Sequence, residues 1–192
     1  FQALLSLALA LGGLAVVFNQ TDTLGGWQPS ELLALVGIYL LVGGLINLII
    51  QPSMQRFMED IRLGTLDFMI LKPEDAQFLI SVRQIEIWKL IDILLGLGVL
   101  VVALVRLGTQ LNPIQALGFG VALLAGGVIV YSFWLILATS AFWFVKTENI
   151  LVIFQAMYQA GRWPVTIYPI WLQTILTFLV PITFAVTVPA QA

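Results

Sequence analysis

The sequence contains no cysteine and no histidine. Without these side chains the chain cannot form disulfides, ligate iron–sulfur clusters or hold haem through histidine, and most zinc sites are excluded. Ser-His and Cys-His nucleophilic pairs are excluded for the same reason, and the sequence also lacks a glycine-rich phosphate loop. We therefore predict that this chain is not an enzyme, and that it binds no metal and no cofactor.

Charged residues are also scarce, at 9% of the chain, whereas soluble domains carry roughly a quarter. Hydrophobic residues make up 60% and the mean hydropathy is +1.04. The formal net charge of -2 offers no basic excess for nucleic acid. This composition predicts an integral membrane protein, and 192 residues allow about five helices of roughly 20 residues each.

The predicted fold is an all-α polytopic membrane domain over the whole chain, with about five transmembrane helices. A face of small residues at Gly37, Gly43 and Gly44 suits helix packing in the second span. Prolines at 164, 169, 181 and 189 interrupt the last part, which predicts a re-entrant or interfacial hairpin. The expected spans are 1–18, 32–50, 85–107, 114–144 and 149–166, with a charged segment at 52–70 and the hairpin at 169–190.

The stretch from Gln51 to Lys89 holds five of the eight basic residues and six of the ten acids. Pro52-Ser53 predicts a helix start, and Gly64 predicts its end. At helical spacing this short helix is amphipathic, with an apolar face opposite a charged one. It can rest on the bilayer surface, anchor the fold, contact a soluble partner, or form a solvated loop. The apolar face holds Met54, Phe57, Met58 and Ile61, and the charged face holds Arg56, Glu59, Asp60 and Arg62.

The distribution of basic residues sets the predicted orientation. Arg56, Arg62, Lys72 and Arg83 all lie in the charged segment, whereas the polar break at 19–30 has no lysine or arginine. By the positive-inside rule, the segment 51–84 is cytoplasmic.

Two polar clusters lie near or within the predicted spans. At the inner interface, Glu86, Lys89 and Asp92 are spaced so that the lysine can pair with either acid. Arg162 is a charge that can lie deep in the bundle, with Gln155 and Gln159 on a related helical face. Either Arg162 lines a cavity or pairs within the bundle, or it extends to the external interface beside Trp163.

Two stretches of the chain resemble a bacterial family of ABC-2 type transporter permeases. They are IRLGTLDFMILKP at 61–73 and AFWFVKTENILVIFQAMYQAGRWPVTIYPIWLQTILTFLVPITFAVTVPAQA at 141–192. The shared pattern includes an Ile-Arg, a Gly, a Leu-Asp and a Lys-Pro, followed by the Arg-Trp-Pro, Ile-Tyr-Pro and Val-Pro-Ala series. The resemblance covers nearly the whole chain.

The resemblance implies a permease subunit that dimerises in the bacterial cytoplasmic membrane and exports its substrate. Separate cytoplasmic ATPase subunits would bind ATP and Mg and dock on a coupling helix at 52–70. A sixth span, absent from these 192 residues, is also implied, so we expect a longer protein. The expected coupling residues are Met54, Arg56, Phe57, Met58, Glu59, Asp60, Ile61, Arg62 and Asp67.

Two other functions fit the composition. The chain could be a non-catalytic structural membrane subunit of a larger complex, although the absence of histidine disfavours subunits that carry pigment or haem. A channel or secondary transporter is the other alternative, for which we would expect buried acids or broken helices in paired halves, and the sequence shows no internal repeat. Co-purification with an ATPase separates the permease from both.

Overall fold

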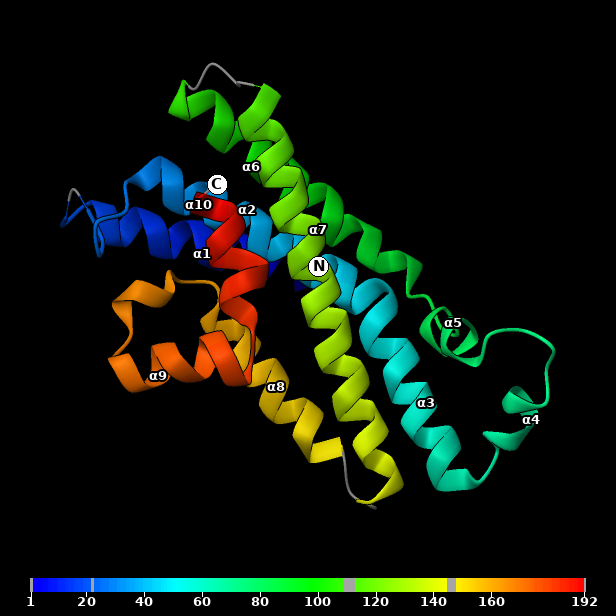
Figure 1. Ribbon diagram of the computed structural model, residues 1–192. Coiled ribbons are helices and arrows are strands. Elements are labelled where there is room, and N and C mark those ends of the chain that lie inside the picture. The colour runs from blue at the N-terminus through cyan, green and yellow to red at the C-terminus, as the bar shows by residue number, and fades with distance from the viewer. Residues whose placement is uncertain (1, 22, 109–112, 145–147, 192) are drawn as a thin grey trace.

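The computed structural model is a bundle of helices that describes residues 2–21, 23–108, 113–144 and 148–191 (Figure 1). No strand forms within these ranges, which confirms the all-helical class. The α-helices are α1 Gln2–Phe18, α2 Pro29–Leu45, α3 Gln51–Leu63, α4 Asp67–Ile70, α5 Ala76–Ser81, α6 Leu90–Leu107, α7 Pro113–Thr139, α8 Glu148–Ala160, α9 Ile170–Thr174 and α10 Val188–Gln191. Shorter 3-10 and π turns are η1 Ile46–Ile50, η2 Ile87–Lys89, η3 Ser140–Phe142, η4 Val165–Ile167, η5 Ile175–Leu179 and η6 Thr183–Thr187.

Three helices of the described chain are long and apolar enough to cross a membrane: Pro29–Leu63, Ile87–Leu107 and Ile114–Phe142. A fourth crossing is added if the bent pair near the C-terminus counts as one span. The five predicted spans are therefore not all reproduced. The apolar part of α1, Leu7–Phe18, and the 13-residue α8 are both shorter than the roughly 20 residues that a straight crossing needs.

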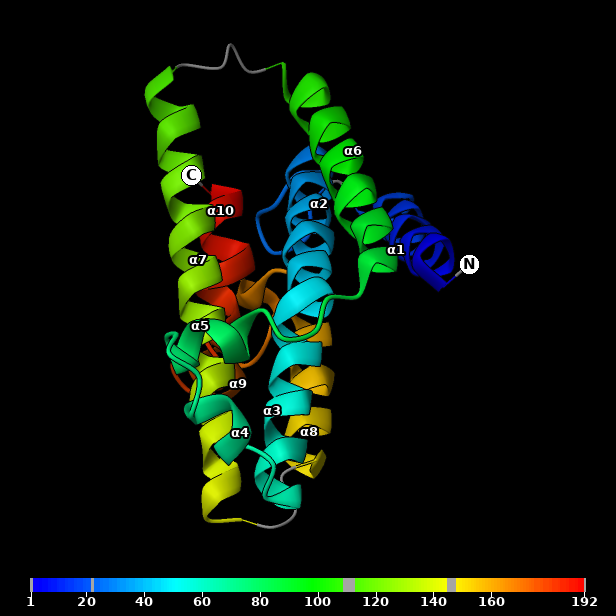
Figure 2. The ribbon, with the colours of Figure 1, turned by 90° about the vertical axis from the view of Figure 1, so that its right-hand side faces the viewer.

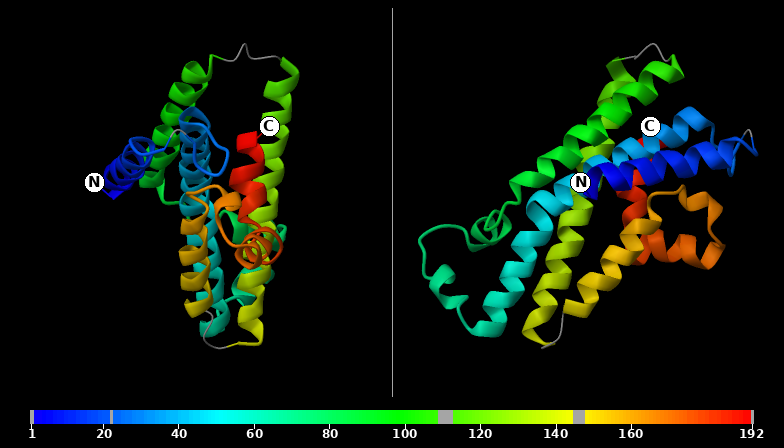
Figure 3. Two further views of the ribbon diagram at one scale, coloured as in Figure 1. Left: turned by 90° about the vertical axis from the view of Figure 1, so that its left-hand side faces the viewer. Right: turned by 180° about the vertical axis from the view of Figure 1, so that it is seen from behind.

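The second span and the predicted amphipathic helix form one continuous helix, through α2, η1 and α3. The predicted helix start at Pro52 is wrong for a specific reason. A proline has no backbone N–H, so it leaves the carbonyl four residues earlier without its helical donor. That carbonyl belongs to Leu48, and the backbone N–H of Glu86 donates to it over 2.8 Å. The π turn η1 ends two residues before the proline, which lies in the first turn of α3, and the helix continues through it with a visible bend (Figure 3).

Glycines let α2 and α6 pack with their backbones in close contact, as predicted for Gly37 and Gly44. A Cβ added to Gly37 would lie 2.8 Å from the Leu100 backbone nitrogen, and one added to Gly96 would lie 2.6 Å from that of Leu41. Distances this short exclude any larger side chain without separation of the two helices. Gly44 meets α6 in the same way, whereas Gly43 faces the Tyr158 ring on α8.

The C-terminal helices fold back between α2 and α7, where α10 runs alongside α7 (Figure 2). The segments Ile170–Leu179 and Thr183–Gln191 meet at an angle of 83° across Val180-Pro181. A Cβ on Gly126 of α7 would lie 2.7 Å from the Phe184 carbonyl, so this contact is also a close backbone approach. The core lies where these elements meet, and includes the fully buried Leu35, Ile38, Trp134, Leu176 and Ile182.

Candidate functional site

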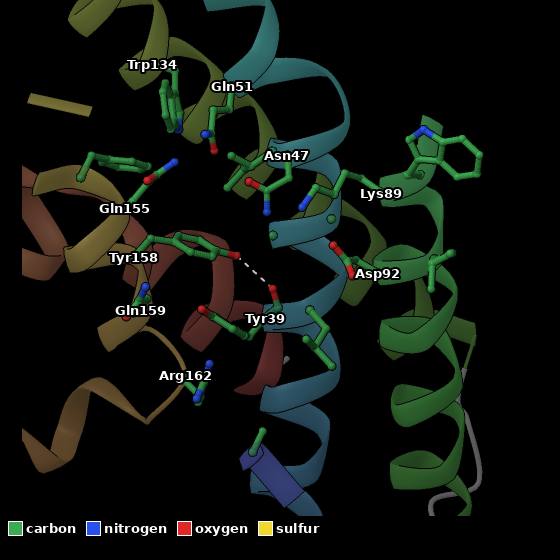
Figure 4. Close-up of a pocket in the computed structure, with 18 residues that line it drawn as sticks. Tyr39, Asn47, Gln51, Lys89, Asp92, Trp134, Gln155, Tyr158, Gln159 and Arg162 are labelled. Carbon is green, nitrogen blue, oxygen red and sulfur yellow. Dashed lines mark hydrogen bonds between the residues drawn. The ribbon is translucent and has the colours of Figure 1, made fainter. Parts of the chain in front are cut away.

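A cavity of about 740 Å³ is lined by side chains of α2, of α8 and of the start of α6. Its volume falls in the range of small-molecule sites in proteins. Figure 4 shows α2 in the middle, with α8 side chains on one side and those of α6 on the other. The lining residues are Ala10, Tyr39, Leu40, Gly43, Gly44, Ile46, Asn47, Gln51, Trp88, Lys89, Ile91, Asp92, Trp134, Phe154, Gln155, Tyr158, Gln159 and Arg162.

Gln155, Gln159 and Arg162 all line this cavity, although α8 ends at Ala160 and Arg162 lies in the turn that follows it rather than on the predicted helical face. The Arg162 guanidinium carbon lies 5.7 Å from the centre of the Tyr39 ring, which is a cation–π contact. Its buried Nε has no acceptor among the described residues. Arg162 therefore faces protein and cavity in this structure, rather than extending away from the bundle.

An aromatic wall joins α8 to α2 and α7, and sequence reasoning missed it. The Tyr158 hydroxyl donates to the Tyr39 carbonyl over 3.0 Å, and the two rings stack with centres 5.0 Å apart. Phe154 meets Trp134 edge-on at 4.8 Å. The signal was present in the i, i+4 spacing of Phe154 and Tyr158, each next to a predicted polar residue.

The three residues of the predicted inner-interface cluster, Glu86, Lys89 and Asp92, do not all lie at the cavity. Lys89 and Asp92 line the cavity, whereas Glu86 does not. The lysine forms no ion pair with either acid in the described structure, although its backbone N–H donates to the Glu86 carbonyl over 2.9 Å. Glu86 instead uses its own N–H to bind Leu48, as described above. Members of two polar clusters that were predicted separately, Lys89 and Asp92 around the start of α6 and Gln155, Gln159 and Arg162 on and just after α8, thus line one cavity.

The apolar face of α3, which was predicted to contact an ATPase, is largely buried inside the protein. Met54, Phe57 and Met58 are buried in the protein's own core, where Phe57 meets Phe142 edge-on at 6.2 Å. They were expected to contact an ATPase, and in this conformation they cannot. The physical reason is that α3 continues α2 and packs against α7 and η3, so its apolar face is already covered.

Asp60 was expected on the charged outer face, and this placement is also wrong. Its side chain is only 1% exposed. The Arg83 Nη2 lies 2.8 Å from its Oδ2, the Arg56 Nε lies 3.6 Å from its Oδ1, and the Thr65 hydroxyl donates to Oδ1 over 3.0 Å. Nearby, the Ser53 hydroxyl donates to the Gln84 carbonyl and accepts from its N–H. These contacts attach the segment before η2 to α3.

The remaining predicted coupling residues lie nearer the surface. Arg56 pairs with Glu59 at 2.6 Å, and both side chains are 41% exposed. Ile61 is half-buried, while Arg62 and Asp67 are exposed. At the end of α3 and just beyond it the chain also exposes large apolar side chains, at Leu63, Phe68, Ile70 and Leu71.

The long apolar helices and the cavity between them define a multi-pass helical membrane protein with a polar site inside its bundle. A family model described as ABC-2 family transporter protein matches residues 4–192. The chain therefore belongs to the ABC-2 family, as the sequence resemblance indicated, and is a permease subunit of an ABC transporter. Such membrane subunits associate with ABC ATPase subunits and are generally non-catalytic. No curated protein and no solved structure matches the chain.

Proposed function

We propose that this chain is half of the transmembrane pathway of a bacterial ABC exporter in the cytoplasmic membrane. Two permease protomers, identical or paralogous, would form the pathway, and two ATPase subunits carrying ATP and Mg would drive it by alternating access. The observation that carries the proposal is the family match over residues 4–192, nearly the full length of the chain. Crosslinking in membranes tests the dimer, and an active complex with a single permease protomer would contradict it.

The length of the α2–α3 helix supports a docking site outside the membrane. Its 35 residues span about 52 Å at 1.5 Å per residue, whereas the hydrocarbon core is about 30 Å thick. The charged α3 end would therefore project on the cytoplasmic side, where the basic residues of the segment place it.

The tip of this projection, Leu63 to Leu71, offers exposed apolar side chains beside exposed charges. Phe68 is 72% exposed and Leu71 is 82% exposed, and Arg62 and Asp67 flank them. An apolar centre with a charged rim is the usual composition of a protein interface. We place the ATPase contact here, with Glu59, Arg62 and Asp67 at the rim, and assign Met54, Phe57 and Met58 to holding α3 on the bundle.

The test compares Phe68→Ser with Phe178→Ser. Both phenylalanines are highly exposed, at 72% and 78%, but Phe178 lies on η5 near the C-terminus. Phe68→Ser should reduce ATPase recovery in a pull-down at least fivefold, because exposed apolar anchors carry much of an interface's energy. Phe178→Ser should leave recovery unchanged. Equal ATPase recovery with the two variants would show that the tip is not the docking site.

The bent pair at 170–191 is proposed as a re-entrant hairpin on the external side. Its 83° bend at Val180-Pro181 supports this proposal, because broken helices at membrane depth are tolerated only where protein covers the freed backbone groups. Here the Thr183 hydroxyl donates to the Leu176 carbonyl over 3.1 Å, which covers one such group across the bend.

A further inference from the structure

The cavity beside α2 carries two buried hydrogen-bond donors that the protein leaves unused. Trp134 is fully buried, and its indole Nε1 has no acceptor among the described residues. The Arg162 Nε is the second such donor. Native proteins pair nearly all buried polar atoms, so two orphaned donors on the wall of one cavity call for an explanation. Indole and guanidinium nitrogens only donate, and the missing groups are therefore acceptors.

The charges on the cavity wall have a net positive sign. Among its lining residues, Lys89 and Arg162 are cations and Asp92 is the only acid. Asp92 lies three residues from Lys89 at the start of α6, whereas the α8 side of the cavity has no carboxylate. The Tyr39 ring offsets part of the cost of holding Arg162 away from water, but it does not accept the Nε–H.

The two donors stand at opposite ends of the aromatic wall. Trp134 contacts Phe154 in the middle of α8, and Arg162 lies in the turn just after this helix, beyond Tyr158 (Figure 4). Between them lie the rings of Phe154 and Tyr158, flanked by Gln155 and Gln159.

We propose that this cavity binds an amphipathic organic anion. Its carboxylate or phosphate would accept from the Arg162 guanidinium, its apolar body would lie on Phe154 and Tyr158, and an oxygen acceptor at its far end would meet the Trp134 indole N–H. The proposal names the substrate class of the transport site and thus rests on the proposed function. The anion is either a membrane phospholipid or a soluble amphipathic acid, which share this chemistry.

Binding is measured on the full chain, with its ATPase when the two copurify, in phosphatidylcholine nanodiscs without ATP. The probe is 11-(dansylamino)undecanoic acid. Its naphthalene ring can lie on the aromatic wall, and its sulfonyl oxygens can accept from the Trp134 N–H. Its primary amide is the neutral control. The acid should bind at least tenfold more tightly than the amide, and Arg162→Gln should weaken the acid roughly ten- to a hundredfold. Trp134→Phe, which removes the donor together with part of the buried indole ring system, should weaken both roughly two- to tenfold.

Arg106→Gln, on the exposed side of α6, is the matched charge control and should change neither affinity. A second measurement does not depend on the folding of an Arg162 variant. The chain has no cysteine, so Gln159→Cys supplies a single thiol on the cavity wall. The acid should slow thiol labelling at this site at least fivefold, and the amide should not. Equal protection by both, or tighter binding of the corresponding undecylamine, would overturn the proposal.

Replacing part of the phosphatidylcholine with phosphatidylglycerol distinguishes the two sources. If phosphatidylglycerol competes with the acid probe, the site binds a phospholipid. If phosphatidylglycerol does not compete, the site binds a soluble anion. Failure of this proposal and failure of the proposed function give different results. If the chain recovers an ATPase but shows no preference for the anion, the substrate class is wrong and the permease function remains; the reverse result rejects the permease function alone.

Discussion

The ion-pair cluster at Asp60 gives a stability prediction that separates buried from exposed charge on a single helix. Asp60→Asn keeps the shape of the side chain and removes its charge, which leaves Arg83 without the partner 2.8 Å away. Breaking a buried pair in this way typically costs about 3–5 kcal/mol. The Arg83 side chain is 25% exposed and can regain some hydration, so we expect a smaller loss, about 2–3 kcal/mol.

The matched control is Glu59→Gln, one residue earlier. It removes the partner of Arg56 at 2.6 Å, but both of those side chains are 41% exposed. Exposed pairs contribute about 0–1 kcal/mol, so this variant should stay within that range. The two substitutions make the same chemical change, acid to amide, and differ mainly in burial.

Thermal unfolding of the purified chain in detergent measures both variants. For a chain of this size, 1 kcal/mol corresponds to a shift of about 2–4 °C, so Asp60→Asn should lower Tm by about 4–12 °C and Glu59→Gln by less than about 4 °C. Asp60→Asn combined with Arg83→Gln should cost clearly less than the sum of the single losses, because the pair is already broken. Similar shifts for the two single variants, or additive losses in the double variant, would refute the reasoning.

Two further predictions test the packing around the cavity. Gly96→Ala should disrupt the α2–α6 contact and reduce the folded yield, because its Cβ would lie 2.6 Å from the Leu41 backbone nitrogen. The control Gly98→Ala should be tolerated, because nothing lies within 4 Å of its Cβ. Equal yields of the two variants in size-exclusion chromatography would contradict this prediction. Tyr158→Phe should lower the free energy of unfolding by about 1 kcal/mol through loss of the 3.0 Å hydrogen bond to the Tyr39 carbonyl, and an unchanged Tm would show that this bond contributes nothing.

Features set by neighbours along one helix were predictable from the sequence. The small-residue face at Gly37 and Gly44 is confirmed, because helical spacing alone places those residues together. The same periodicity brings Gln155 and Gln159 to one side of α8, whereas Arg162 reaches the cavity from the turn after this helix, which ends at Ala160. The all-helical class followed from the high mean hydropathy and the scarcity of charge.

Features that depend on distant residues were not predictable. Pro52 reads locally as a helix start, and only the N–H of Glu86 explains why the helix continues through it. The sequence around Asp60 predicts a solvated charge, but in the structure Arg83 pairs with it and its side chain is buried. In both cases the partner comes from the stretch between α5 and η2, which lies along α3, and no periodicity within α3 signals that contact.

The continuous α2–η1–α3 helix gives the proposed transport cycle a physical connection. Tyr39, Asn47 and Gln51 of this helix line the cavity, and its far end forms the tip where we place the ATPase. A separate helix lying across the membrane surface would have to transmit movement through a flexible joint. Here the π turn is held by the Glu86 hydrogen bond at Leu48, and α3 is held by Ser53 and Asp60. Movement at the tip would therefore reach Asn47 and Gln51 through a single helix, and would carry along the start of α6, where Lys89 and Asp92 face the same cavity.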